Sequence, residues 1–159
     1  AEEMVEPLLE VLGPEPFDDW NAKIAAAKCR GKRSPIKTTL LDQKFVVGVG
    51  NIYACEALHN AGISPTKLAA KLVTKSGKPT KALEKLVDEV KIVLKKAIAA
   101  GGSTLNDFAD VDGNLGYFSH HFTIYGREDQ PCLKAGCSGT VERIVQSNRS
   151  TFWCPRCQK

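Results

Sequence analysis

The stretch "VVGVGNIYACEAL", residues 46–58, decides the fold of this 159-residue chain. Gly48 and Gly50 interrupt an apolar run, which then passes through Asn51 into a segment with helical spacing. We expect Asn51 to cap this helix and Gly62 to end it. The main chain at Gly50 and at the start of the helix would then expose N–H groups beside the positive end of the helix dipole. The stretch therefore predicts an anion site, although a turn that only packs would use the same residues.

The segments around this stretch predict a mainly α fold. Helical spacing or capping residues indicate about five helices, over 19–29, 36–42, 52–61, 66–73 and 81–100. β-branched and aromatic residues predict short strands at 122–125, 139–145 and 150–154. The polar, glycine-containing segment 103–117 predicts a loop. We expect a helical domain followed by a small β module.

Four of the six cysteines lie near the end of the chain with the spacing C-x4-C-x16-C-x2-C. They are Cys132, Cys137, Cys154 and Cys157. Paired cysteines in a chain without a secretion signal favour a metal over disulfides, and a closed set of four thiolates suits one structural Zn²⁺. Four thiolates leave no position for water, which argues against a catalytic zinc. The remaining two, Cys29 and Cys55, are expected to be small buried thiols.

Basic side chains are concentrated after residue 20. Residues 1–20 carry seven acidic and no basic side chains, whereas residues 21–159 carry 22 Lys and Arg against 11 Asp and Glu. This asymmetry predicts a polyanionic partner, with a solvated lysine-rich surface as the alternative. Lys37 and Lys44 lie close enough upstream of the glycine turn to reach the same anion. No apolar run is long enough to span a membrane, and the acidic start does not resemble a signal peptide.

One arginine falls at a distinctive place between the cysteine pairs. The polar segment 146–150 contains Arg149 and lies where a hairpin between the two pairs would turn. A guanidinium held on a rigid turn suits the oxygens of a phosphate. An exposed turn arginine without a role is the alternative.

Several segments together resemble the formamidopyrimidine-DNA glycosylases. "LLDQKFVVGVGNIYACEAL" resembles the helix-two-turn-helix motif of that family, and "GGSTLNDFADVDGNLGYF", "YGRE" and "RSTFWCPRCQK" resemble its later parts in the same order. The resemblance runs from "LGPEPF" to the last lysine. It implies a connector at 1–18, a helix-two-turn-helix DNA-binding domain at 19–125 and a four-cysteine zinc finger at 126–159.

The resemblance also implies a function in DNA repair. Members of this family remove oxidised purines, such as 8-oxoguanine and formamidopyrimidines, from double-stranded DNA, and they nick the abasic site by β,δ-elimination. The damaged nucleotide is flipped out of the duplex, which exposes an atom that the base stack hides. By resemblance, Asn51 and Arg149 would bind phosphates that flank the flipped nucleotide, Lys37 and Tyr125 would lie near the DNA, and the loop at 103–117 would close over the flipped base.

The catalytic group of the family matches no segment of this chain. Its nucleophile is the amine of an N-terminal proline on a separate lobe, and a Schiff base requires such an activated amine. We therefore expect this chain to be a fragment, the C-terminal lobe of a bacterial cytoplasmic glycosylase/AP lyase, which binds DNA as a monomer without catalysing alone. A stand-alone zinc-dependent DNA-binding module and an endonuclease VIII-like enzyme for oxidised pyrimidines are the alternatives. The first cysteine pair, C-x4-C, departs from the C-x2-C of the family, which predicts an altered loop with zinc retained.

Overall fold

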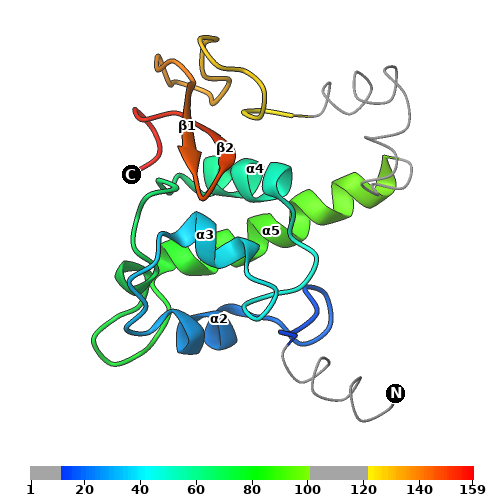
Figure 1. The fold of residues 1–159 in the computed structure, drawn as a ribbon, viewed down its shortest axis with the longest axis vertical. Coiled ribbons are helices and arrows are strands. Elements are labelled where there is room, and N and C mark those ends of the chain that lie inside the picture. Colours follow the sequence, from blue (N-terminus) through cyan, green and yellow to red (C-terminus); the bar gives the residue numbers. More distant parts are fainter. Residues whose placement is uncertain (1–11, 101–121) are drawn as a thin grey trace.

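The computed structural model describes residues 12–100 and 122–159. Its elements in chain order are α2 (Ala22–Cys29), α3 (Ile36–Leu41), α4 (Asn51–Ala61), the 3₁₀ helix η1 (Ala69–Leu72), α5 (Lys81–Ala99), β1 (Glu142–Gln146) and β2 (Arg149–Trp153). In Figure 1 the β1–β2 hairpin lies beside α4, and α5 passes behind α3 and below α4 in this view. The expected mainly α fold with a terminal β-hairpin is confirmed. The loop expected at 103–117 lies outside the described residues.

Helix α5 is long because its apolar residues repeat with helical spacing. The side chain of Thr80 caps it by accepting a hydrogen bond from Leu83 N at 3.3 Å. Its buried face comprises Leu83, Leu86, Val87, Val90, Leu94 and Ala97. The opposite face carries charged side chains, and none of the helices in the described ranges is both long and apolar enough to cross a membrane.

The glycine turn starts α4 differently from the prediction. Gly48 has a φ of 85°, and Gly50, rather than Asn51, is the N-cap residue. No side chain caps the first turn: Gly50 has none, and the amide oxygen of Asn51 accepts from Lys37 Nζ instead. The amide nitrogen of Asn51 donates to Ser150 O in the hairpin at 3.0 Å. The predicted end is confirmed: Gly62 adopts the left-handed conformation, with a φ of 75°.

The strands β1 and β2 pair antiparallel around a two-residue turn. Gln146 pairs with Arg149, and Ser147 and Asn148 between them have φ values of 49° and 65°. Positive φ at both positions gives a turn whose twist matches that of the strands. Arg149 is therefore the first residue of β2, with its side chain exposed at the tip of the hairpin.

Two segments differ from the sequence prediction. Residues 122–125 form bends and turns instead of a strand, because the carboxylate of Glu56 accepts the hydrogen bonds of three of their N–H groups. Within 66–73 only the short η1 is helical. The start of that segment pairs with the chain before α3 through a bridge between Pro35 and Leu68, which takes the main-chain groups a longer helix would need.

Helix α4 lies between two apolar cores. The larger core gathers side chains of α2, α3, α4 and α5, Leu58 among them, together with Trp20, which precedes α2. The smaller core joins Cys55 of α4 to Ile124, Phe152 and two of the four clustered cysteines. Because α4 contributes to both cores, it holds the hairpin in place against the helical domain. Cys29 and Cys55 are buried, as predicted.

Candidate zinc centre and nucleic-acid interface

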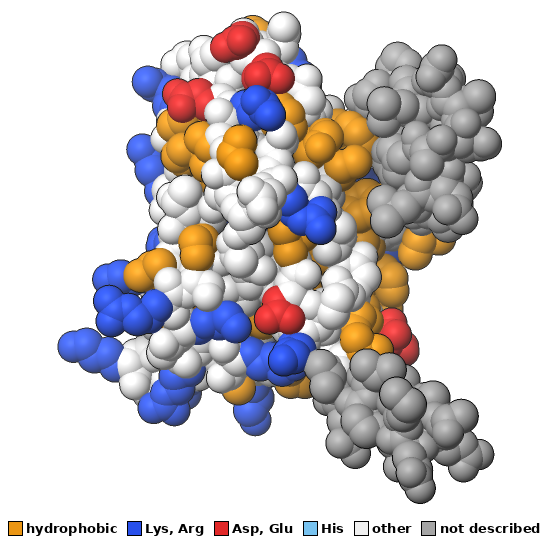
Figure 2. Space-filling view, viewed as in Figure 1, with side chains coloured by type: hydrophobic (Ala, Val, Ile, Leu, Met, Phe, Trp, Pro, Cys, Tyr) orange, Lys and Arg blue, Asp and Glu red, His pale blue; other side chains and the backbone are white. Residues whose placement is uncertain are grey.

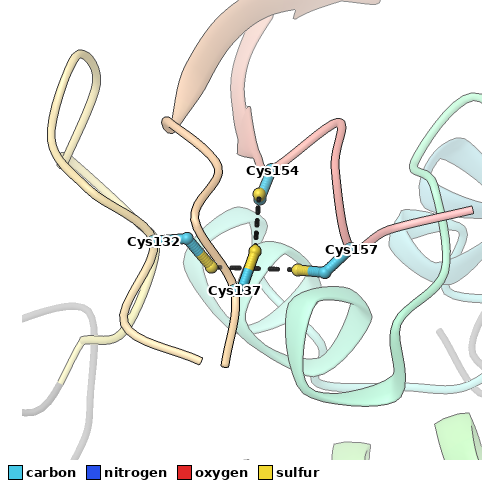
Figure 3. Close-up of side chains that lie close together, drawn as sticks. All are labelled: Cys132, Cys137, Cys154 and Cys157. Carbon is cyan, nitrogen blue, oxygen red and sulfur yellow. Dashed lines mark hydrogen bonds between the residues drawn. The ribbon is translucent and has the colours of Figure 1, made fainter. Parts of the chain in front are cut away.

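The four predicted metal ligands converge on one point. Two precede β1 and two follow β2, and their sulfurs all lie within 4.8 Å of one another (Figure 3). The Sγ atoms of Cys132 and Cys157 are 3.8 Å apart, and those of Cys137 and Cys154 are 3.7 Å apart. A tetrahedron with Zn–S bonds of about 2.3 Å has edges of about 3.8 Å, whereas a disulfide would need about 2.0 Å. The donor set therefore fits one structural Zn²⁺, and the longer first loop does not prevent convergence.

Gly139 joins the two cysteines of the first pair, Cys132 and Cys137, through its main chain. Its N–H donates to Cys137 Sγ at 3.4 Å and lowers the pKa of that thiol, while its carbonyl accepts from Cys132 N at 2.9 Å. A Cβ atom at this position would lie 2.5 Å from Cys154 Sγ and 2.8 Å from Arg156 Cβ. The site therefore requires glycine at residue 139.

Two polar side chains attach the zinc hairpin, which is the β1–β2 hairpin with its four flanking cysteines, to the end of α4. Gln158 is buried; its Oε1 accepts from Cys154 N at 2.7 Å and its Nε2 donates to Ile63 O at 2.9 Å. Lys134, in the loop between the first two cysteines, donates from Nζ to the carbonyl of His59 at 2.9 Å. The end of α4 and the zinc hairpin are therefore held together by polar contacts as well as by the smaller core.

Glu56 of α4 holds the chain that leads into the zinc hairpin. Its buried carboxylate accepts N–H groups of Thr123 at 2.7 Å and of Ile124 and Tyr125 at 2.9 Å. A carboxylate with several N–H donors is well suited to burial, because its lone pairs are satisfied. Our sequence analysis missed Glu56; its only signal was a carboxylate on an otherwise apolar stretch of helix.

His59 is a second buried polar residue of α4 that the sequence analysis missed. Its Nε2 lies 3.3 Å from Cys132 Sγ and its Nδ1 lies 3.2 Å from Thr123 Oγ1. Burial, with the positive charges of Lys134 and Arg127 nearby, lowers the pKa of His59 to about 4. The available signal was its position three residues after Glu56, which places both side chains on one face of the helix.

Lys37 lies inside the protein, behind Asn51. Its side chain has no exposed area. Its Nζ donates to Asn51 Oδ1 and, at 2.7 Å, to Thr151 Oγ1, and it lies 3.5 Å from Ser150 O. Burial lowers the pKa of Lys37, and the nearby charge of Arg149 lowers it further. The ammonium therefore joins α3, α4 and β2 instead of lying on the surface, and a contact with DNA stays a prediction.

The amide of Asn51 is oriented from two directions. An ammonium group can only donate, so the oxygen of the amide must face Lys37. The nitrogen donates one hydrogen to Ser150 O. An amide nitrogen carries two hydrogens, so the second is available to a further acceptor.

A groove of about 390 Å³ opens beside Asn51 and brings four of the predicted DNA-binding residues together. Gly50 and Asn51 line it from the start of α4, and Arg149 lines it from the hairpin tip. Tyr125 lines it from the segment that precedes Cys132, the first clustered cysteine. Lys44 is not part of its lining; that residue is exposed, and its N–H donates to Asp42 at 2.9 Å. The DNA contacts of all these residues stay predictions.

Basic side chains collect on one part of the surface. In Figure 2 the Lys and Arg side chains gather toward the lower left, around α2 and the loops beside it in the matching view of Figure 1. Carboxylates are few on this face, and most of them lie at the top of the view, away from these basic side chains. A surface of this kind attracts polyanions at long range.

The comparisons with known proteins match both parts of the chain. Residues 12–109 match the model of the formamidopyrimidine-DNA glycosylase H2TH domain, and residues 129–159 match the zinc finger found in FPG and IleRS. A formamidopyrimidine-DNA glycosylase of Rhodopseudomonas palustris strain BisB18 is 52% identical over 155 residues, which cover 97% of this chain and 53% of that protein. The chain thus spans about half the length of the curated relatives it matches.

Two solved structures have the same fold. MutM in complex with DNA containing carbocyclic 8-oxo-G has a TM-score of 0.78 and 32% identity, covering 99% of this chain and 55% of that one. The Lactococcus lactis Fpg in complex with abasic-site DNA has a TM-score of 0.79 and 30% identity, covering 100% of this chain and 56% of that one.

The fold and the cysteine cluster define an H2TH domain followed by a four-cysteine zinc finger. The chain belongs to the formamidopyrimidine-DNA glycosylase family, of which it carries the C-terminal H2TH and zinc-finger region.

Proposed function

We propose that this chain is the DNA-binding part of a base-excision-repair glycosylase and AP lyase for oxidised purines, such as 8-oxoguanine and formamidopyrimidines. Its ligand is double-stranded DNA that contains an oxidised purine or an abasic site. The chain alone binds this DNA, whereas base removal and β,δ-elimination require a separate catalytic lobe such as the family carries. The proposal extends to this chain the activity for which its relatives are named.

The observation that carries the proposal is the composition of the groove beside Asn51. Its lining offers the amide of Asn51, the guanidinium of Arg149 and the uncapped start of α4 at Gly50, and no carboxylate lines it among the described residues. Hydrogen-bond donors without acidic neighbours, next to a helix N-terminus, favour a phosphate group. Phosphate contacts of this kind set the register of a protein on DNA.

In this proposal Asn51 and Arg149 bind phosphates directly, and Lys37 acts through Asn51. The Lys37 ammonium and the Ser150 carbonyl hold the amide so that its second N–H is free for the ligand. Because Ser150 belongs to the zinc hairpin, the metal supports both phosphate ligands: it holds Arg149 on the hairpin tip and it orients Asn51 from β2.

The binding test uses the whole chain, zinc-loaded, and a duplex with a tetrahydrofuran abasic site, measured by fluorescence anisotropy at fixed salt. Replacing Arg149 by Ala should weaken binding by about tenfold or more, because a charge-assisted hydrogen bond contributes about 1.5–3 kcal/mol. Lys85→Ala is the matched control: it also removes one positive charge, but it lies on an exposed face of α5 that contributes nothing to the groove. Equal affinity of wild type and Arg149→Ala, with both folded, would exclude the proposed role of the hairpin tip.

A fusion experiment separates the proposed enzyme from the two alternatives. The part of the Rhodopseudomonas relative that this chain does not span is fused ahead of it, and incision is measured on 8-oxoguanine and thymine glycol duplexes. We expect incision by the fusion, strongest on 8-oxoguanine, and binding without incision by the chain alone. A folded fusion that binds but never incises would favour a stand-alone binding module, and a strong preference for thymine glycol would favour the endonuclease VIII-like alternative.

A further inference from the structure

His59 makes a contact that the proposed DNA-binding function does not use. It extends from α4 toward Cys132, and the residue is 2% exposed. Its Nε2 lies 3.3 Å from the sulfur of Cys132, one of the four zinc ligands. Because this contact is buried, the two atoms have no water to replace it if it is lost.

The chemistry of a zinc site determines which of the two atoms, His59 Nε2 or Cys132 Sγ, donates the hydrogen bond. A zinc-bound cysteine is a thiolate, which has no proton and can only accept a hydrogen bond. The contact is therefore a hydrogen bond only if Nε2 carries the hydrogen, and in a neutral ring Nδ1 is then an acceptor.

Thr123 supplies the donor that this tautomer requires. Its hydroxyl lies 3.2 Å from His59 Nδ1 and 3.0 Å from Glu56 Oε1, so its single proton can go to either. Glu56 does not depend on it, because backbone N–H groups of residues 123–125 already donate to both carboxylate oxygens. When the Thr123 hydroxyl turns toward His59, the side chains of His59, Thr123 and Glu56 all keep a hydrogen-bond partner.

We infer that His59 supports the zinc ion from outside its coordination sphere, by donating Nε2–H to the Cys132 thiolate while Nδ1 accepts from the Thr123 hydroxyl. The donor withdraws charge from a set of four thiolates around one dication, and it fixes the position of one sulfur. Loss of zinc should therefore be slower with this hydrogen bond than without it. Since His59 lies on the helix that begins at Asn51, the contact also connects zinc occupancy to the element that lines the groove.

Two amide variants of the full chain separate the two hydrogen bonds. The nitrogen of Gln extends about as far from the main chain as Nε2 of His, whereas Asn extends only about as far as Nδ1. His59→Gln can therefore donate to Cys132, and His59→Asn can reach only Thr123. Release of zinc to a chromogenic chelator should be about 10- to 100-fold faster for His59→Asn than for wild type, and within about threefold of wild type for His59→Gln.

Cobalt gives a spectroscopic reading of the same contact. With Co²⁺ in place of zinc, the thiolate-to-metal charge-transfer band should shift in His59→Asn and return toward the wild-type position in His59→Gln. If His59 only filled space, the band would shift to the same extent in both variants. Equal release rates and equal spectra for all three proteins would overturn the inference.

A measurement on the wild-type chain keeps the inference testable if the variants do not fold. In ¹⁵N spectra of the zinc-loaded protein, Nε2 of His59 should carry the hydrogen and Nδ1 should be bare. With ¹¹³Cd in the site, the Nε2 hydrogen should show a scalar coupling to the metal through the hydrogen bond. A ring protonated at Nδ1 alone would refute the inference, and since no DNA is present, this outcome is independent of the proposed function.

Discussion

At the scale of single residues, the main result is that Lys37 does not lie where its charge suggested. A lysine beside a glycine turn in a basic stretch indicates a surface cation, yet the structure buries it completely. Its ammonium is surrounded by oxygens of Asn51, Ser150 and Thr151, which come from two other elements. No pattern near Lys37 in the sequence identifies Ser150 and Thr151 as partners, because these hairpin residues lie more than 110 positions away.

Replacing Lys37 by Met tests its positioning role. Met fills a similar volume without a donor, so the amide of Asn51 loses the partner that fixes its orientation. We expect affinity for an abasic-site duplex to fall by about tenfold, while the helix content measured by circular dichroism stays close to that of wild type. The effect on stability should be smaller, because removing a buried charge offsets part of the cost of the lost hydrogen bonds. Unchanged affinity in a folded Lys37→Met protein would contradict the role.

At the scale of elements, α4 organises the molecule. It begins at the groove, contributes to both apolar cores and carries Glu56 and His59 toward the zinc hairpin. The sequence predicted the existence and end of this helix, because the apolar spacing and Gly62 are local signals. It did not predict the cap: the amide oxygen of Asn51, a good capping residue, accepts from Lys37 instead, and only tertiary structure creates that competitor.

Glu56→Gln tests whether α4 holds the segment before the zinc loop. An amide offers one oxygen where the carboxylate offers two, so at least one backbone N–H of residues 123–125 would face an NH₂ group. We expect the free energy of unfolding to fall by about 2–3 kcal/mol, because these hydrogen bonds are charge-assisted and buried. Urea denaturation measures the change. Glu84→Gln, on an exposed position in the first turn of α5, is the matched control and should lower stability by less than about 1 kcal/mol, through the helix dipole alone. A Glu56→Gln protein as stable as this control would argue against the role.

At the scale of the whole molecule, two apolar cores share helix α4, and the smaller core includes two of the four clustered cysteines. The order of elements and the four ligands could be predicted from sequence, since helical periodicity and cysteine spacing are short-range patterns. The prediction of a strand at 122–125 was wrong, because the carboxylate of Glu56, far away in the sequence, accepts hydrogen bonds from the N–H groups of this segment. The sequence analysis singled out Gly50, Asn51, Tyr125 and Arg149 but did not predict that they line one groove, because they come from elements whose packing the sequence does not specify.

Removal of zinc should disturb both the fold of the β1–β2 hairpin and the binding of DNA at the groove. Without metal the hairpin has only the six-residue core and a two-stranded sheet, which is too little to fold alone. We expect a chelator to abolish the amide protection of β1 and β2 in hydrogen exchange, while α5 keeps most of its protection within the larger core. Binding of abasic-site DNA should weaken as well, since Arg149 and the partner of Asn51 lie on the hairpin. Full protection of the hairpin in the metal-free protein would contradict this prediction.

The salt dependence of DNA binding tests the central claim most directly. The dissociation constant for an abasic-site duplex is measured against KCl concentration for wild type, Asn51→Ala and Arg149→Ala. Phosphate contacts by charged side chains release counterions, so Arg149→Ala should reduce the slope of the log–log plot by about 1. Asn51→Ala should weaken binding without changing the slope, because its amide is neutral. If Arg149→Ala instead kept the wild-type slope, or Asn51→Ala the wild-type affinity, the groove beside α4 would not be the phosphate-binding site.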